Sequence, residues 1–405
     1  MPERGARIAR REERAYWAYV SDEQRREAGC PARQAVLLQR RQATSLVQCD
    51  RVRRSLSGVL LVFSAVVVLL HRDAVARIDP ASKLPPSVAR YLARVGFDTD
   101  DVAAVAAGRA ASRVIEASTR ELLGVVAVVR VDRPAHRYID AFRDIVTFEK
   151  GGNGVISMGT FSKPAKLDDI GALTLTDVDL DDLRHCRVTS CDMNLSAAAI
   201  QRFRQVKWSA PAAQAQARHV WQTTLVDYVN DYQARGNAAL VAYEDRSAPI
   251  ALAARSTALF AESDALAPLS DVASYFTKYR SLPLPPEAEE FFYWQQLTFG
   301  MKPVTRVNHV VMSLQTIDGR PSWAIVSRMI YSSHYFRDGL EVRYLVPVDA
   351  STPAGGFYLV LVSRSHSESL AGLKGLLLGG IIRRKVRDST ARHVAHVKAK
   401  LEERP

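Results

Sequence analysis

Two histidines lie in stretches whose period-two alternation predicts β-strands, and they are well placed for acid–base chemistry or ligand anchoring. One lies in RVNHVVM and the other in MIYSSHYF. Successive strand residues point to opposite faces, so a polar group enters any cavity that either face lines. A buried polar group needs a partner, and a ligand can supply it. We therefore predict that five residues bind a ligand: His309, Arg328, Tyr331, His334 and Tyr335. The alternative is that the two histidines are structural residues that form hydrogen bonds across the sheet.

Other chemistry-bearing residue types do not form a recognisable catalytic or metal site. Ser333 and His334 are adjacent, but neighbours on a strand point apart and no G-x-S-x-G elbow exists. The acidic stretch 177–182 lacks the glycine and closing glutamate of a calcium loop. The glycine-rich segment 151–154 does not match a phosphate-binding loop. The sequence therefore predicts no catalytic residue, no metal and no cofactor.

Cys186 and Cys191 are two of the four cysteines and are spaced C-x4-C. In an oxidising compartment two nearby cysteines usually pair, so we predict a disulfide across this short loop. Zinc would need further ligands, and only His185 is close in sequence. Two free thiols are the remaining alternative.

The compartment is indicated by residues 52–76. Arg53 and Arg54 precede an uncharged, mostly apolar run from Leu56 to Leu70, and an Ala-x-Ala site ends at Ala76. This is the pattern of a secretory signal peptide. The run is shorter than the roughly 20 apolar residues that span a bilayer, so a membrane anchor is the alternative. We expect a protein that is exported, either periplasmic or anchored to the membrane and facing the periplasm.

Residues 1–51 are rich in arginine, contain no lysine and show no apolar period. We expect them to be a disordered or non-native extension, because a GUG codon for Val52 could also initiate translation. Segments 1–51 and 52–76 together carry about half of the chain's net charge of +12. The remaining charge is modest for the length, and we expect no nucleic-acid partner.

The order of the predicted elements is strands, an amphipathic helix, a helical middle and then strands before a long helix. Period-two patterns predict strands over 111–117, 122–131 and 155–161, and 3.6-residue periods predict a helix over 135–148. The middle of the chain carries its strongest helix at 211–235, and its last, aromatic-rich helix is predicted at 287–297. The closing elements are four antiparallel strands over 304–314, 322–335, 340–346 and 355–363, and a helix over 370–403.

Two segments carry a family resemblance. VVRVDRPAHRYIDAFRDIVTFEK resembles the first strand and following helix of the START/polyketide-cyclase-like superfamily, and LAGLKGLLLGGIIRRKVRDSTARHVAHVKAKLE resembles its long C-terminal helix. CRVTSCDMNL, FFYWQQLTFGMKPV and IYSSHYF also resemble an exported bacterial family of unknown function. The resemblance implies an α+β helix-grip fold, in which a curved antiparallel sheet surrounds the C-terminal helix. The core would comprise 77–163 and 301–405, with a large, mainly helical insertion over 164–300.

Members of that superfamily typically hold lipids, sterols or polyketide-like molecules between sheet and helix. The resemblance thus implies a non-catalytic protein that binds a hydrophobic or lipid-like small molecule. One alternative is a cyclase- or hydrolase-like enzyme using His309 or His334 as acid or base. Another is a structural or interaction protein of the envelope that uses the insertion as its partner surface. The basic collar of residues 383–387 suggests contact with a membrane surface.

Overall fold

The structure, a computed structural model, describes residues 80–403 apart from 153, 299–301, 350–354 and 371. The extension expected over 1–51 and the signal sequence or anchor expected over 52–76 lie outside the described residues. Within the described part, no helix is long and apolar enough to cross a bilayer.

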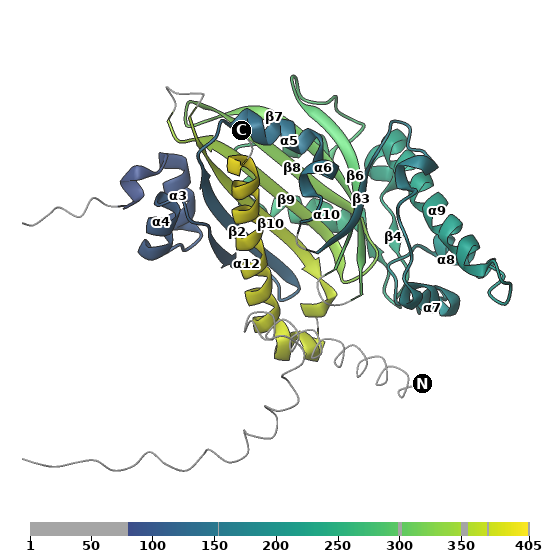
Figure 1. Ribbon diagram of the computed structural model, residues 1–405. Coiled ribbons are helices and arrows are strands. Elements are labelled where there is room, and N and C mark those ends of the chain that lie inside the picture. Colours follow the sequence, from purple (N-terminus) through teal and green to yellow (C-terminus); the bar gives the residue numbers. More distant parts are fainter. Residues whose placement is uncertain (1–79, 153, 299–301, 350–354, 371, 404–405) are drawn as a thin grey trace, which may run out of the picture. The chain divides into compact units, whose positions relative to one another are not determined.

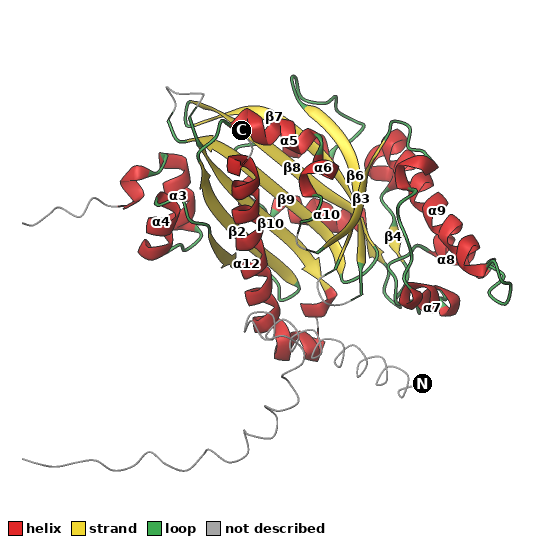
Figure 2. Cartoon of the chain, viewed as in Figure 1, coloured by secondary structure: helices red, strands yellow, loops and turns green. Residues whose placement is uncertain are grey.

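An eight-stranded, curved antiparallel sheet organises the described residues, in the spatial order β1-β2-β10-β9-β8-β7-β6-β3. Its central strands are rich in valine and other β-formers, and β2 is buried along nearly its whole length. Figure 2 shows the sheet with helices around it. The strands are β1 (Ala111–Ile115), β2 (Leu122–Val131), β3 (Val155–Phe161), β6 (Glu289–Leu297), β7 (Val304–Ile317), β8 (Arg320–Ser332), β9 (Phe336–Pro347) and β10 (Phe357–Ser367).

One face of the sheet, which we term the α12 face, packs against three helices: α5 (Ala135–Arg143), α6 (Ile145–Glu149) and α12 (Gly372–Glu403). In Figure 1, α12 crosses in front of the sheet as the long yellow helix. Near its C-terminus α12 buries an apolar stripe of Val394, Val397 and Leu401. Tyr138 and Phe142 of α5 join the same cluster. A core that links both helices to the sheet fixes their placement over it.

The opposite face, which we term the insertion face, packs against helices from before β1 and from the segment between β3 and β6. Side-chain caps begin several of these helices: Asp98 caps α4, Thr176 caps α7 and Ser196 caps α8. The helices are α3 (Pro86–Arg94), α4 (Thr99–Ala106), α7 (Asp177–His185), α8 (Ala197–Arg204), α9 (Ala213–Arg235), α10 (Leu252–Ala261) and α11 (Ser270–Thr277).

Short elements complete the chain. They are the strand pair β4 (Ala242–Tyr243) and β5 (Ile250–Ala251), and the 3-10 turns η1 (Pro80–Lys83), η2 (Leu167–Ile170), η3 (Gly236–Ala239), η4 (Asp264–Leu266) and η5 (Glu368–Leu370).

The predicted α+β class is confirmed: a curved antiparallel sheet, a long C-terminal helix and a sizeable helical region are all present, and they are consistent with a helix-grip-like fold. The helix predicted over 287–297 is wrong. This segment is β6, which pairs with β3 on one side and β7 on the other. Phe292 and Trp294 enter the insertion-face core, whereas Tyr293 enters the α12-face core. The aromatic run is apolar on both faces because both faces of the sheet are covered.

The predicted Cys186–Cys191 disulfide is present, and both cysteines are buried. It closes a short loop directly after α7. A disulfide is compatible with an exported protein.

Candidate functional site

His309 lies on β7 at the centre of a buried cluster on the insertion face. Its Nε2 donates to Glu290 Oε2 at 2.9 Å, and its Nδ1 lies 3.2 Å from the Tyr232 hydroxyl. The ring stacks on Phe292 and contacts Phe276. Burial lowers the pKa of His309 from 6.5 to about 4, outweighing the opposite effect of the Glu290 carboxylate. The ring is therefore neutral at physiological pH, and both of its nitrogens are occupied.

Arg328 faces His309 across the β7–β8 pair and belongs to the same cluster. Its Nη1 donates to Asn237 Oδ1 at 2.6 Å and to the carbonyl oxygen of Phe276 at 3.0 Å. These bonds tie the sheet to the segments after α9 and at the end of α11. These contacts explain His309 and Arg328 structurally: both residues hold the insertion against the sheet.

His334 and Tyr335 lie in the loop between β8 and β9. The two ring nitrogens of His334 lie 3.0 Å from Asp179 Oδ1 and 2.9 Å from the carbonyl oxygen of Asp192. Although burial alone would raise the pKa of Asp179, its hydrogen bonds with His334 and Thr176 lower it below the ordinary value. Tyr335 adopts a positive φ, and its hydroxyl accepts from the backbone N–H of Lys302 at 3.1 Å.

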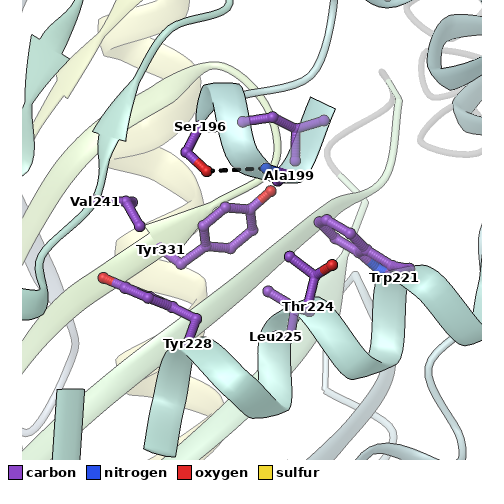
Figure 3. A pocket seen from close by; sticks show the side chains of 9 residues that line it. Ser196, Ala199, Trp221, Thr224, Leu225, Tyr228, Val241 and Tyr331 are labelled. Atoms are coloured by element: carbon purple, nitrogen blue, oxygen red, sulfur yellow. Dashed lines mark hydrogen bonds between the residues drawn. The ribbon is translucent and has the colours of Figure 1, made fainter. Parts of the chain in front are cut away.

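Tyr331 contributes to a small cavity between the sheet and the insertion (Figure 3). The cavity has a volume of about 30 Å³ and is lined mainly by apolar groups of α8, α9 and β8. Its walls include Trp221 and Thr224, whose indole N–H and hydroxyl have no hydrogen-bond partner among the described residues. A space of this size holds one or two water molecules, so it does not accommodate a lipid-like ligand.

The structure therefore brings His309 and Arg328 together and places the other predicted residues elsewhere. Tyr331 shares the insertion face with them, and its hydroxyl donates to the carbonyl oxygen of Asn194 at 2.9 Å. Each of the five side chains has partners within the protein. Arg328 Nε alone among their buried nitrogen atoms has none in the described part of the chain. The role of the five residues in ligand binding stays a prediction. The other face of the sheet also holds buried polar groups without partners.

The α12 face carries such a group of polar side chains at the middle of the sheet. Strand parity places Asn308, Ser327 and Arg343 on this face, because Val310, Ile325 and Leu345 of the same strands lie in the core beneath α5 and α12. The three side chains occupy neighbouring strands, β7, β8 and β9. We call them the donor cluster.

All three residues of the donor cluster are at least nine-tenths buried, with exposed fractions of 6% for Asn308, 4% for Ser327 and 5% for Arg343. Asn308 Nδ2, Ser327 Oγ and Arg343 Nε have no hydrogen-bond partner among the described residues. A buried donor without a partner costs about 1–3 kcal/mol. The Tyr138 hydroxyl of the same core also has no partner among the described residues. Several such donors on one face, within a mainly apolar core, point to a missing acceptor.

Arg343 is the charged member of this cluster. Its guanidinium lies 4.9 Å from the centre of the Phe142 ring, and its Nη1 lies 2.5 Å from Glu341 Oε1. Burial acts to lower the pKa of Arg343, but Glu341, together with Tyr138, Tyr293 and Glu149, outweighs burial and holds the pKa above its ordinary value. Arg343 therefore carries its positive charge inside the core. A second guanidinium, that of Arg306, lies on the same face of β7.

Sequence reasoning did not select the donor cluster, although β9 contains a signal for it. Glu341 and Arg343 are two residues apart in LEVRYLVP, so they point to the same face of a strand that is otherwise largely apolar. A pair of charges on one face usually indicates a solvated surface. Here Arg343 is buried because α5 covers it.

Comparisons of the chain with protein-family models, with curated proteins and with solved structures found no match.

Proposed function

We propose that the protein binds a hydrophobic or lipid-like small molecule between the α12 face of the sheet and the C-terminal helix, without catalysing a reaction on it. The observation that carries the proposal is the donor cluster: buried, partnerless donors of Asn308, Ser327 and Arg343 surrounded by apolar side chains. Ligand sites in proteins have this composition, mostly apolar with a few polar groups that orient the ligand.

The fold supports the same proposal. A curved sheet with a long helix across one face is the arrangement implied by the START-like resemblance of the first strand-and-helix segment and the C-terminal helix. Membership of that superfamily is part of the proposal, since fold similarity alone does not establish function. We further propose export, supported by the signal-like sequence over 52–76 and by the Cys186–Cys191 disulfide.

Native mass spectrometry of the full chain, purified from its own envelope or culture fluid, tests the proposal. We expect an additional mass from a small molecule that organic solvent extracts. A neutral fluorescent probe, N-phenyl-1-naphthylamine, should also bind to the delipidated protein with increased emission. A protein that carries no extractable molecule and does not bind the probe would exclude the proposed function.

A further inference from the structure

We infer that the ligand is an amphipathic molecule with a carboxylate head group, and that the donor cluster anchors this head group. This inference rests on the proposed function and adds the chemical class of the ligand.

The unused groups are all able to donate. Arg343 Nε and Asn308 Nδ2 are N–H donors, and the Ser327 hydroxyl has a rotatable proton. A ligand that satisfies all three must therefore present acceptor oxygens. A purely apolar molecule would leave the donors buried and unpaired, which opposes its binding.

The strand register places Ser327 next to each of the other two donors. Ser327 lies directly opposite Glu341, which is two residues from Arg343 on β9. On its other side Ser327 lies opposite Val310, two residues from Asn308 on β7. The three residues thus form a diagonal across adjacent strands, with Ser327 in the middle. Diagonal neighbours of this kind are about 7–8 Å apart, within the reach of long side chains.

The unpartnered Nε edge of Arg343 favours an anion. The middle of the sheet contributes two guanidinium groups, from Arg306 and Arg343, and one carboxylate, from Glu341. Glu149 of α6 also acts electrostatically on Arg343, and its carboxylate lies 4.0 Å from His393 Nε2 of α12. A carboxylate bound to the free Nε edge of Arg343 would form charge-assisted hydrogen bonds, which are stronger than neutral ones.

The face also provides the apolar part of the site. The Phe142 ring lies against the Arg343 guanidinium, and Val310 and Met312 continue the same face of β7. An aliphatic chain extending from the head group would contact these side chains and those of α12. The combination of one polar anchor and an apolar wall matches a fatty-acid-like molecule.

Displacement of N-phenyl-1-naphthylamine by dodecanoic acid, 1-dodecanol and methyl dodecanoate at pH 8 tests the inference. The delipidated full chain should bind the acid about tenfold or more tightly than the alcohol or the ester. Arg343→Met, which keeps the length and removes the charge, should abolish this preference while the alcohol still binds. Arg343→Lys should retain part of it. Arg202→Met, which removes an exposed arginine of α8, should leave the preference unchanged.

The outcomes separate the inference from the proposed function. If neither the probe nor any dodecyl compound binds, the proposed function itself fails. If the acid and the alcohol bind equally, the protein binds apolar ligands but the carboxylate assignment is wrong. A preference for the acid that persists in Arg343→Met would remove Arg343 as the anchor. Should that variant not fold, as judged by circular dichroism, Asn308→Leu replaces it, with a smaller loss of preference expected.

Discussion

Replacing His309 with glutamine should remove a pH-dependent part of the folding stability. The folded protein holds His309 neutral, because burial lowers its pKa from 6.5 to about 4. The unfolded chain binds a proton at the ordinary pKa, so unfolding takes up a proton between these two values. Stability from this group is therefore fully present above about pH 6.5 and is lost as the pH falls toward about 4. The pKa of Glu290 is also lowered, so the carboxylate stays ionised across this window.

The size of the effect follows from the shift in pKa. At about 1.4 kcal/mol per pKa unit, the wild type should lose about 3 kcal/mol between pH 6.5 and pH 4 from His309 alone. The His309→Gln variant lacks this pH-dependent contribution to stability but keeps every other titrating group. Urea unfolding of both proteins at several pH values measures the difference between the two curves. Parallel curves over this range would refute the reasoning. So would a titration near pH 6.5 of the His309 resonance, assigned by its absence from the spectrum of the His309→Gln variant.

Three further predictions concern stability. Asp179→Ala leaves His334 buried without its carboxylate and should cost about 3–5 kcal/mol by urea unfolding, whereas a loss below about 1 kcal/mol would contradict a role for the pair. Replacing both Cys186 and Cys191 with serine should cost about 2 kcal/mol, from the loop-closure entropy of a short loop. A reducing agent should lower the melting temperature of the wild type but not that of this double variant. Gly236→Ala should destabilise by about 3 kcal/mol, because a Cβ there collides with a backbone carbonyl in the segment after α11 at a positive φ. An unchanged melting temperature would show that the backbone relaxes.

The strands and the C-terminal helix could be predicted from the sequence because each has a strong and regular pattern. The run LLGVVAVVRV is too apolar for anything but a buried element, and it forms β2. Asp318 and Gly319 form the tight turn between β7 and β8 that their sequence favours, both with positive φ. These signals are local, so they do not depend on which elements later pack together.

The segment at 287–297 could not be assigned in the same way. Its aromatic residues Phe292, Tyr293 and Trp294 follow one another without polar alternation, a pattern that suits a helix side as well as a strand buried on both faces. The partners that decide the matter, β3 and β7, lie on either side of it in space. One of them is separated from it in sequence by the whole insertion.

Periodicity also does not determine which face of the sheet a given side chain occupies. Alternation correctly places Ser327 and Arg328 on opposite faces. It would also separate Arg328 from Tyr331, yet both lie on the insertion face, because a bulge in the β7–β8 pairing shifts the register near Ile330. Whether a given face meets the insertion or α12 depends on packing that spans the chain. His309 and Arg328 consequently lie against the insertion, whereas the partnerless Arg343 lies beneath α5.

The position of the insertion between β3 and β6 has a consequence for the order of folding. Among the described strands, β3 has β6 as its only neighbour, so it joins the sheet only when Phe161 and Phe292 meet. Closing so long a connection is entropically unfavourable while it is unfolded. The side chain of Asn230 on α9 bonds to the backbone of Ala165, just after β3. Its Oδ1 accepts from the Ala165 N–H at 2.7 Å, and its Nδ2 donates to the Ala165 carbonyl oxygen at 3.0 Å. A preformed α9 would thus deliver β3 to the sheet edge, and the amides of β3 should gain protection from hydrogen exchange after those of the central strands.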